Sequence, residues 1–216
     1  MNFRIKLPPK KNYIMHLKQT NSELKGKKPA YIVKWALSQA ENPILTTNFR
    51  PYEVALLHLV TQIEPNIKVI WCDTGYNTKA TYLHVIDLTQ RLQLNLHTYV
   101  PKQSVGYRNA LLGIPEVGTK NHEIFSEQVK LEPFRRAMQE HQPDFWFTNL
   151  RMGQTAFRDS IDVISKSKDG IIKVSPFYDF SDEQLDEYLK EFNLPNEMDY
   201  YDPTKVFENR ECGIHN

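Results

Sequence analysis

The sequence predicts an α/β protein built on a doubly wound, mostly parallel sheet with helices on both faces. Two observations carry this prediction. Short apolar runs alternate with amphipathic segments between residues 29 and 193, and polar residues follow several of the apolar runs. Such alternation predicts right-handed crossovers and parallel strands, and ligands of these sheets bind beyond the carboxyl ends of the strands. The residues after each predicted strand are therefore the first candidates for a site.

Short apolar runs mark the predicted strands. They are bounded by proline, asparagine, aspartate or glycine, which is typical of strands buried in a sheet. We expect the last of them to leave the sheet. The predicted strands are residues 43–48, 68–75, 94–100, 144–151 and 170–180.

Amphipathic segments between these runs predict the helices. Pro29 and Pro51 stand where a first helical turn favours proline. Ser181 and Gln184 have the spacing of a capping box at the start of the last helix. The predicted helices are residues 29–41, 51–63, 81–92, 122–141 and 181–192.

The composition excludes several classes of protein. A chain of 216 residues and 25.4 kDa fits one domain, or one domain and a tail. The hydrophobic content of 40% and the net charge of +1 fit a globular protein without the basic excess of nucleic-acid-binding proteins. No apolar run approaches the roughly 18 residues of a membrane span, and the first residues lack a signal-peptide pattern. We expect a cytoplasmic protein that binds neither nucleic acid nor membrane.

The chain is predicted to have three parts. Residues 1–28 hold eight Lys or Arg against the single acid Glu23, and this segment is either solvated or attracts an anionic ligand or partner. Residues 29–193 form the α/β domain, which we expect to bind a nucleotide. The pattern stops after Pro195, so residues 194–216 are predicted to be a C-terminal tail.

Two predicted strand ends carry groups that suit an anion. Thr46, Thr47 and Asn48 follow the first strand and run into a helix, whose N-terminal N–H groups and dipole favour a phosphate. The alternative is that these three residues only cap the helix. Arg151 and Arg158 flank the loop after the fourth strand. Each can bind an oxyanion through two hydrogen bonds, although isolated arginines are more often surface charges.

Asp73, Thr74 and Gly75 follow the second strand. These residue types form tight turns, but an acid at this place in an α/β sheet also commonly meets a ribose or a base. Both readings stand for this segment. A hydroxyl-rich loop, an acid and paired arginines together favour an anionic nucleotide.

The chain has only two cysteines and no CxxC pair, which argues against a disulfide framework, a zinc site and an iron–sulfur cluster held by thiolates. Cys72 lies within a predicted strand, and we expect an inert core thiol there. Cys212 lies four residues from the C-terminus, after Arg210 and Glu211 and close to His215. An exposed thiol with basic neighbours is expected to be reactive.

Several segments together carry a resemblance to a known family. They are "EVALLHLVTQIEPNIKVIWCDTGY", "TYLHVIDLTQRLQLNLHTYV", "KLEPFRRAM", "LR" followed by "FR", and "ECGIH", of which the last is the most specific. From about residue 29 to the C-terminus the chain resembles the phosphoadenosine phosphosulfate (PAPS) reductase family, a branch of the adenine-nucleotide alpha-hydrolase-like fold.

The resemblance implies a thiol-dependent reductase of assimilatory sulfate reduction. Cys212 would be the nucleophile, with His215 as its companion, and would take the sulfonate of PAPS as an S-sulfocysteine. An external dithiol, thioredoxin or glutaredoxin, would then release sulfite, and no iron–sulfur cluster is expected. Members of the family are often dimeric, so the resemblance also admits a homodimer.

The resemblance also assigns the binding residues. By the family pattern, Thr46, Thr47 and Asn48 match the phosphate loop, Asp73, Thr74 and Gly75 the nucleotide-proximal turn, and Lys130, Arg151 and Arg158 the anion-binding positions.

Two departures from the family pattern affect these expectations. Arg50 stands where the family loop has a glycine, so that its side chain either clashes with the phosphate or adds a cation to the site. The segment before the "ECGIH" motif is also shorter than is usual in the family, which limits how far Cys212 can travel.

Two other functions are compatible with the fold. A non-catalytic or altered-substrate adenine-nucleotide-binding paralogue would bind adenosine 3',5'-bisphosphate without turnover, and Arg50 and the short tail keep this alternative open. An ATP pyrophosphatase of the same fold is disfavoured, because the SGGxDS loop of those enzymes is absent from the sequence.

Overall fold

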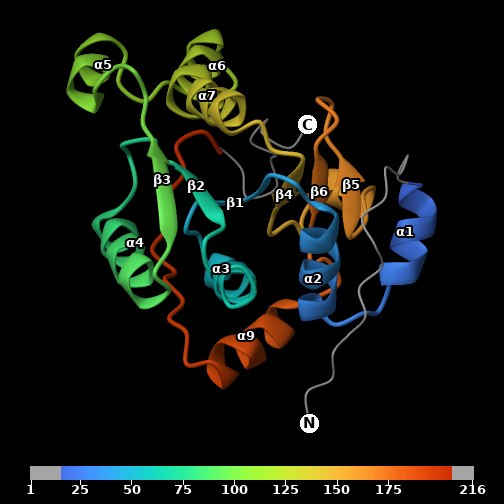
Figure 1. Cartoon of the computed structure of the whole chain (residues 1–216). Helices are drawn as coiled ribbons and strands as arrows, with labels where there is room; N and C mark the ends of the chain where they lie inside the picture. The colour runs from blue at the N-terminus through green and yellow to red at the C-terminus, as the bar shows by residue number, and fades with distance from the viewer. Residues whose placement is uncertain (1–15, 206–216) are drawn as a thin grey trace.

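The computed structural model describes residues 16–205 and shows a twisted six-stranded sheet between layers of helices (Figure 1). The strand order is β3-β2-β1-β4-β6-β5, and only β5 runs antiparallel to its neighbour in this described part. The doubly wound, mostly parallel fold predicted from the sequence is confirmed. The strands are β1 (Pro43–Thr47), β2 (Lys68–Cys72), β3 (Asn95–Tyr99), β4 (Phe145–Phe147), β5 (Ile164–Lys166) and β6 (Ile172–Val174).

All of the helices predicted from the sequence are present. The capping box at Ser181 and Gln184 is formed as expected, and the predicted helix at residues 122–141 is interrupted by a π-helical turn, η1. Three helices of eight residues or fewer were not predicted: α1, α5 and α8. The helices are α1 (Leu17–Leu24), α2 (Pro29–Gln39), α3 (Glu53–Thr61), α4 (Lys79–Arg91), α5 (Val105–Leu111), α6 (Lys120–Ser126), η1 (Glu127–Leu131), α7 (Glu132–His141), α8 (Ala156–Asp159) and α9 (Asp182–Glu191).

The sheet buries both of its faces. Leu45 and Phe147 point to the larger core, where α2, α3, α4 and α9 cover the sheet. Ile44, Ile70 and Trp146 point to the opposite face, which α7 covers. The alternation follows from the two-residue period of a strand. Each of these buried side chains stabilises the fold by about 1.5–3 kcal/mol relative to an exposed one, so the strands read as continuous apolar runs.

The last predicted strand does not leave the sheet. The strand found in this segment, β6, lies between β4 and β5 in the sheet. It is only three residues long, as is β4. The predictions at residues 144–151 and 170–180 were too long because the apolar residues after each strand are buried in loops rather than paired. The edge strand β5 was missed because only one of its three residues is buried.

Helix α1 covers the edge strand β5, although it lies in the segment assigned to a basic N-terminal extension. The side chain of Asn21 donates to the carbonyl of Ile164 and accepts from its N–H group, both at 2.8 Å. Asn21 thereby satisfies the two backbone groups that a neighbouring strand would otherwise pair. Among residues 16–205, no helix has the length and apolar character needed to cross a membrane.

Gly75 allows the loop after β2 to pack against α5. Its φ angle is +80°, and an added Cβ atom would lie 2.5 Å from a methyl carbon of Val105. Gly118 has nearly the same φ angle, +79°, but an added Cβ atom there would meet nothing within 4 Å. The two glycines therefore share a backbone requirement, and only Gly75 has a packing requirement as well.

We expect Gly75→Ala to destabilise the fold by about 1–3 kcal/mol more than Gly118→Ala. Both changes lower the free energy of unfolding by about 1–2 kcal/mol, because each places a residue with a Cβ atom in the left-handed conformation. The change at position 75 also forces Val105 or the loop to move. Urea unfolding of the two variants checks this. Equal losses would show that the approach of Val105 is relaxed at no cost.

Candidate active site

The loops that follow β1 and β4 meet at one end of the sheet and form a pocket. Strand β1 pairs with β2 on one side and with β4 on the other. After β1 the chain continues to β2 on one side of this point, and after β4 it continues to β5 and β6 on the other side. This is the switch point at which α/β sheets bind ligands. The pocket is also lined by Cys72 and by residues of η1, α8 and the C-terminal segment. Four cations and one carboxylate line it: Arg50, Lys130, Arg158, Lys205 and Glu53.

The predicted phosphate loop lines the pocket through Thr46, Thr47 and Asn48. The Thr47 hydroxyl accepts from the N–H of Phe49 at 3.0 Å, and Asn48 Oδ1 accepts from the N–H of Arg50 at 3.3 Å. The Thr46 hydroxyl accepts from the indole of Trp146 at 2.7 Å. These side chains shape the loop and face the pocket.

The start of helix α3 depends on the C-terminal segment. Tyr52, the residue before the helix, is left-handed and has no side-chain capping bond of its own. Its N–H donates instead to Asn196 Oδ1 at 2.8 Å. The alternative that Thr46, Thr47 and Asn48 only cap the helix is therefore wrong. The residue at the N-cap position is Tyr52, and its N–H group is bound by Asn196.

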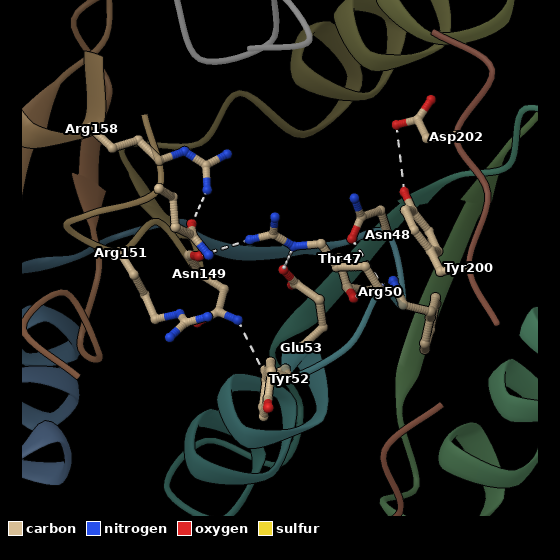
Figure 2. Close-up of polar contacts among 12 residues, drawn as sticks. Thr47, Asn48, Arg50, Tyr52, Glu53, Asn149, Arg151, Arg158, Tyr200 and Asp202 are labelled. Carbon is tan, nitrogen blue, oxygen red and sulfur yellow. Dashed lines mark hydrogen bonds and ion pairs between the residues drawn. The ribbon is translucent and has the colours of Figure 1, made fainter. Parts of the chain in front are cut away.

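Arg50 lies in the wall of the pocket. Its Nε atom donates to Glu53 at 3.0 Å, and Nη2 donates to the carbonyl of Asn149 at 3.2 Å (Figure 2). The left-handed residues of this loop are Phe49 and Tyr52, so the backbone at position 50 does not require glycine. Arg50 thus lines the pocket as a cation paired with Glu53.

Lys130 lies in the pocket wall and is buried, with 5% of its surface exposed. Its Nζ atom forms an ion pair with Asp202 and a 3.3 Å hydrogen bond to the hydroxyl of Thr204. Burial tends to raise the pKa of Asp202, but the charge and hydrogen bonds of Lys130 and Thr204 outweigh burial and hold it below its ordinary value. The ion pair is therefore charged at neutral pH.

Residues 200–205 are docked rather than free. Besides the pair with Lys130, Asp202 accepts from the N–H of Thr204 at 3.0 Å, and the carbonyl of Pro203 lies 3.1 Å from His122 Nε2. The carbonyl of Asp199 accepts from Thr78 and Thr81 at the start of α4. This anchoring brings Lys205 into the pocket.

The two predicted anion-binding arginines are separated. Arg158 is 4% exposed, lines the pocket and bonds to Gln154. Arg151 is not among the lining residues; it pairs with Asp182 at 2.6 Å, at the start of α9, and lies over the ring of Tyr52. Figure 2 shows the two guanidinium groups well separated, with that of Arg151 on the side of Tyr52. Arg151 thus holds α9 and α3 together.

The segment Asp73-Thr74-Gly75 forms a turn outside the pocket lining. One carboxylate oxygen of Asp73 accepts from the N–H of Gly75, from Asn77 and from the hydroxyl of Tyr82, at 2.8, 2.8 and 3.0 Å. Burial and the Asp73 charge raise the pKa of Tyr82 to about 12. Of the two readings, the turn is the one that these contacts support.

Eight residues of the pocket lining were not predicted as site residues: Glu53, Ile70, Cys72, Phe134, Thr148, Asn149, Leu150 and Lys205. Cys72 was expected to be an inert core thiol, but it is half-buried at the end of β2 and faces the pocket. A shorter prediction for that strand would have placed it at a carboxyl end. The position of Lys205 depends on how the C-terminal segment folds back, for which the sequence has no local signal.

Known proteins of similar sequence show the family to which the chain belongs. Residues 42–200 match the sequence model of the phosphoadenosine phosphosulfate reductase domain. The chain belongs to the PAPS reductase family. A PAPS reductase of Xylella fastidiosa is 35% identical, with 85% of this chain and 87% of that protein covered. One from Aliivibrio fischeri is 33% identical, with 84% and 72% covered.

Solved structures share the fold. The crystal structure of a PAPS reductase from Candida auris in complex with phosphate superposes with a TM-score of 0.75 at 24% identity, covering 88% of this chain and 91% of that one. A U34-tRNA thiolase from Methanococcus maripaludis, which holds a [4Fe-4S] cluster, has a TM-score of 0.55 at 11% identity, covering 94% and 77%. Within residues 16–205 of this family member, no three His, Cys, Asp or Glu side chains are grouped as metal ligands.

The predicted residues of the "ECGIH" motif and its basic neighbour lie outside the described part of the chain. They are Glu211, Cys212 and His215 in the motif and Arg210 before it. Lys205 in the pocket precedes Cys212 by seven positions. Since an extended chain spans at most about 3.3–3.6 Å per residue, these positions allow a reach of roughly 25 Å. The short segment before the motif is therefore long enough for the cysteine to meet the pocket.

Asp202→Ala is expected to destabilise the protein by about 3–5 kcal/mol, because it removes one partner of a buried ion pair. The matched control is Glu127→Ala, which breaks an exposed pair with Arg135 and should cost less than about 1 kcal/mol. Guanidinium unfolding measures both. Similar losses in the two variants would mean that the buried pair contributes no more than a surface pair.

Proposed function

We propose that this protein is a thiol-dependent reductase that converts PAPS to sulfite and adenosine 3',5'-bisphosphate. The observation that carries the proposal is the cation-lined pocket at the switch point, beside the docked segment that leads to the "ECGIH" motif. Membership of the PAPS reductase family supports it.

The pocket suits the phosphosulfate of PAPS. Arg158 and Lys130 are buried cations, and Lys205 faces them from the C-terminal segment. Charge-assisted hydrogen bonds from such groups to phosphate oxygens are about twice as strong as neutral ones. Arg50 places a further cation beside the phosphate loop.

The reaction proceeds through a covalent intermediate on Cys212. Its thiolate attacks the sulfonate sulfur, a new S–S bond forms, and the S–O bond to the 5'-phosphate breaks. Adenosine 3',5'-bisphosphate leaves with the electron pair of that bond. One thiol of an external dithiol then attacks the Cys212 sulfur, a mixed disulfide forms, and sulfite leaves with the electron pair of the broken S–S bond. The second thiol of the dithiol attacks the mixed disulfide, so that the Cys212 thiol is regenerated and the dithiol protein leaves in its disulfide form.

The cations act on both the nucleophile and the leaving group. Arg210 and His215 lie close to Cys212 in the sequence and, with the phosphate-binding cations, favour the ionised thiol. Arg158 and Lys130 balance the charge that develops on the leaving phosphate. Glu211 is a neighbour of the nucleophile for which we propose no separate step.

Thioredoxin or glutaredoxin is the reductant that we propose. A catalytic thiol that must be regenerated as a thiol fits a reducing compartment, which supports a cytoplasmic location. Cys72 takes no part in these steps.

Cys212→Ser should lower sulfite formation by at least about a thousandfold, because an alcohol cannot replace the thiolate. The affinity for adenosine 3',5'-bisphosphate should stay within about threefold. Sulfite assays with thioredoxin and calorimetric titration check the two expectations. Wild-type protein incubated with PAPS and no reductant should gain one sulfonate on Cys212 by intact-protein mass spectrometry. Sulfite formation by the serine variant would refute the mechanism.

Arg158→Gln should weaken the binding of adenosine 3',5'-bisphosphate by about ten- to a hundredfold, since it removes a charge-assisted bond in the pocket. Arg91→Gln is the matched control, because Arg91 is exposed on α4 and bonds to Asn193. Arg151→Gln distinguishes the family expectation from the observed geometry: lost binding would make Arg151 an anion contact, and lost stability alone would make it structural.

A further inference from the structure

Arg108 is a buried cation that the candidate reaction does not use. Only 1% of its surface is exposed. Nη2 donates to the carbonyl of Gln103 at 3.0 Å and Nε donates to Gln128 at 3.4 Å, while Nη1 is buried without any hydrogen-bond partner. Among residues 16–205, the ion pairs that the structure shows do not include Arg108. A buried charge of this kind is costly unless an acceptor compensates it.

Arg108 lines a cavity of its own. The cavity lies between the start of α5 and the η1–α7 segment, and Lys102 and Gln128 also line it. It has a volume of about 240 Å³, below the roughly 300–1,000 Å³ of sites for drug-sized ligands. It shares no lining residue with the pocket after β1 and β4. A small ligand therefore suits this cavity better than a nucleotide does.

Two carboxylates at the cavity already have partners. Glu127 pairs with Arg135, and hydrogen bonds from Arg135 lower the pKa of Glu127. Glu132 lies 3.0 Å from Lys102 and 3.3 Å from Arg136. The hydrogen bond from Arg136 is the largest cause that lowers the pKa of Glu132, and the bond from Lys102 lowers it further. Both carboxylates are thus ionised and bound to other cations. Four cations surround two carboxylates here, and Arg108 is the cation with no counter-charge.

We propose that this cavity binds a small oxyanion of the sulfate and phosphate class, held by Arg108. A guanidinium presents its donors in a rigid fork that matches the oxygens of such an anion. The long contact to Gln128 is the weaker of the two bonds of Arg108, and it is the one that an incoming anion replaces as Nη1 gains its acceptor. The Arg108 guanidinium also lies 6.0 Å from the ring of Tyr76.

Equilibrium dialysis with radiolabelled sulfate tests the proposal. Adenosine 3',5'-bisphosphate is added to occupy the first pocket, and chloride is kept low. Wild-type protein and Arg91→Gln should bind sulfate alike, whereas Arg108→Gln should bind it at least about tenfold more weakly. Arg158→Gln should keep the Arg108 site. Equal binding by wild-type and Arg108→Gln protein would overturn the proposal.

Selenate soaked into wild-type crystals gives a second measurement that does not depend on how well a variant folds. An anomalous peak within hydrogen-bond distance of Arg108 Nη1 is the expected result. The absence of such a peak at saturating selenate would refute the proposal. A Glu127 carboxylate turned onto Arg108 in those crystals would show that the chain neutralises this cation itself.

Discussion

The pairing of β1 with both β2 and β4 is the constraint on which the rest of the structure depends. Ile44 lies beside Trp146, about a hundred residues further along the chain, and Leu45 lies beside both Val69 and Phe147. Because three strands with two buried faces meet here, a shift of register by one residue would turn the side chains of each core to the opposite face of the sheet. The same pairing brings the loops after β1 and β4 together, so the fold's most constrained region also holds its candidate site.

Local signals were enough to predict five of the six described strands and the helices longer than eight residues, in their order along the chain. Pro29, the capping box at Ser181 and the apolar runs each fix an element through the preferences of a few neighbouring residues. The edge strand β5 and helix α1 have no such signal, because each is stabilised by the other through Asn21. Contacts between distant segments decide what local sequence does not.

The candidate site was predicted in part for the same reason. The hydroxyls of Thr46 and Thr47 follow a strand that the sequence shows plainly, and they line the pocket. Lys205 lies in it because the segment before it is anchored, in part by the ion pair of Asp202 with Lys130, a pairing between residues 72 positions apart that no pattern reveals. Arg151 and Arg158 look equivalent in the sequence, but their side chains lie apart because Arg151 forms an ion pair with Asp182.

The bond between Asn21 and Ile164 also bears on how copies of this chain could associate. Sheets often extend from one molecule to another when an edge strand presents free N–H and C=O groups. At β5 a side chain of the same molecule occupies these groups of Ile164. A homodimer would therefore not be built by continuing the sheet across this edge, which leaves the strand order of each subunit closed at β5.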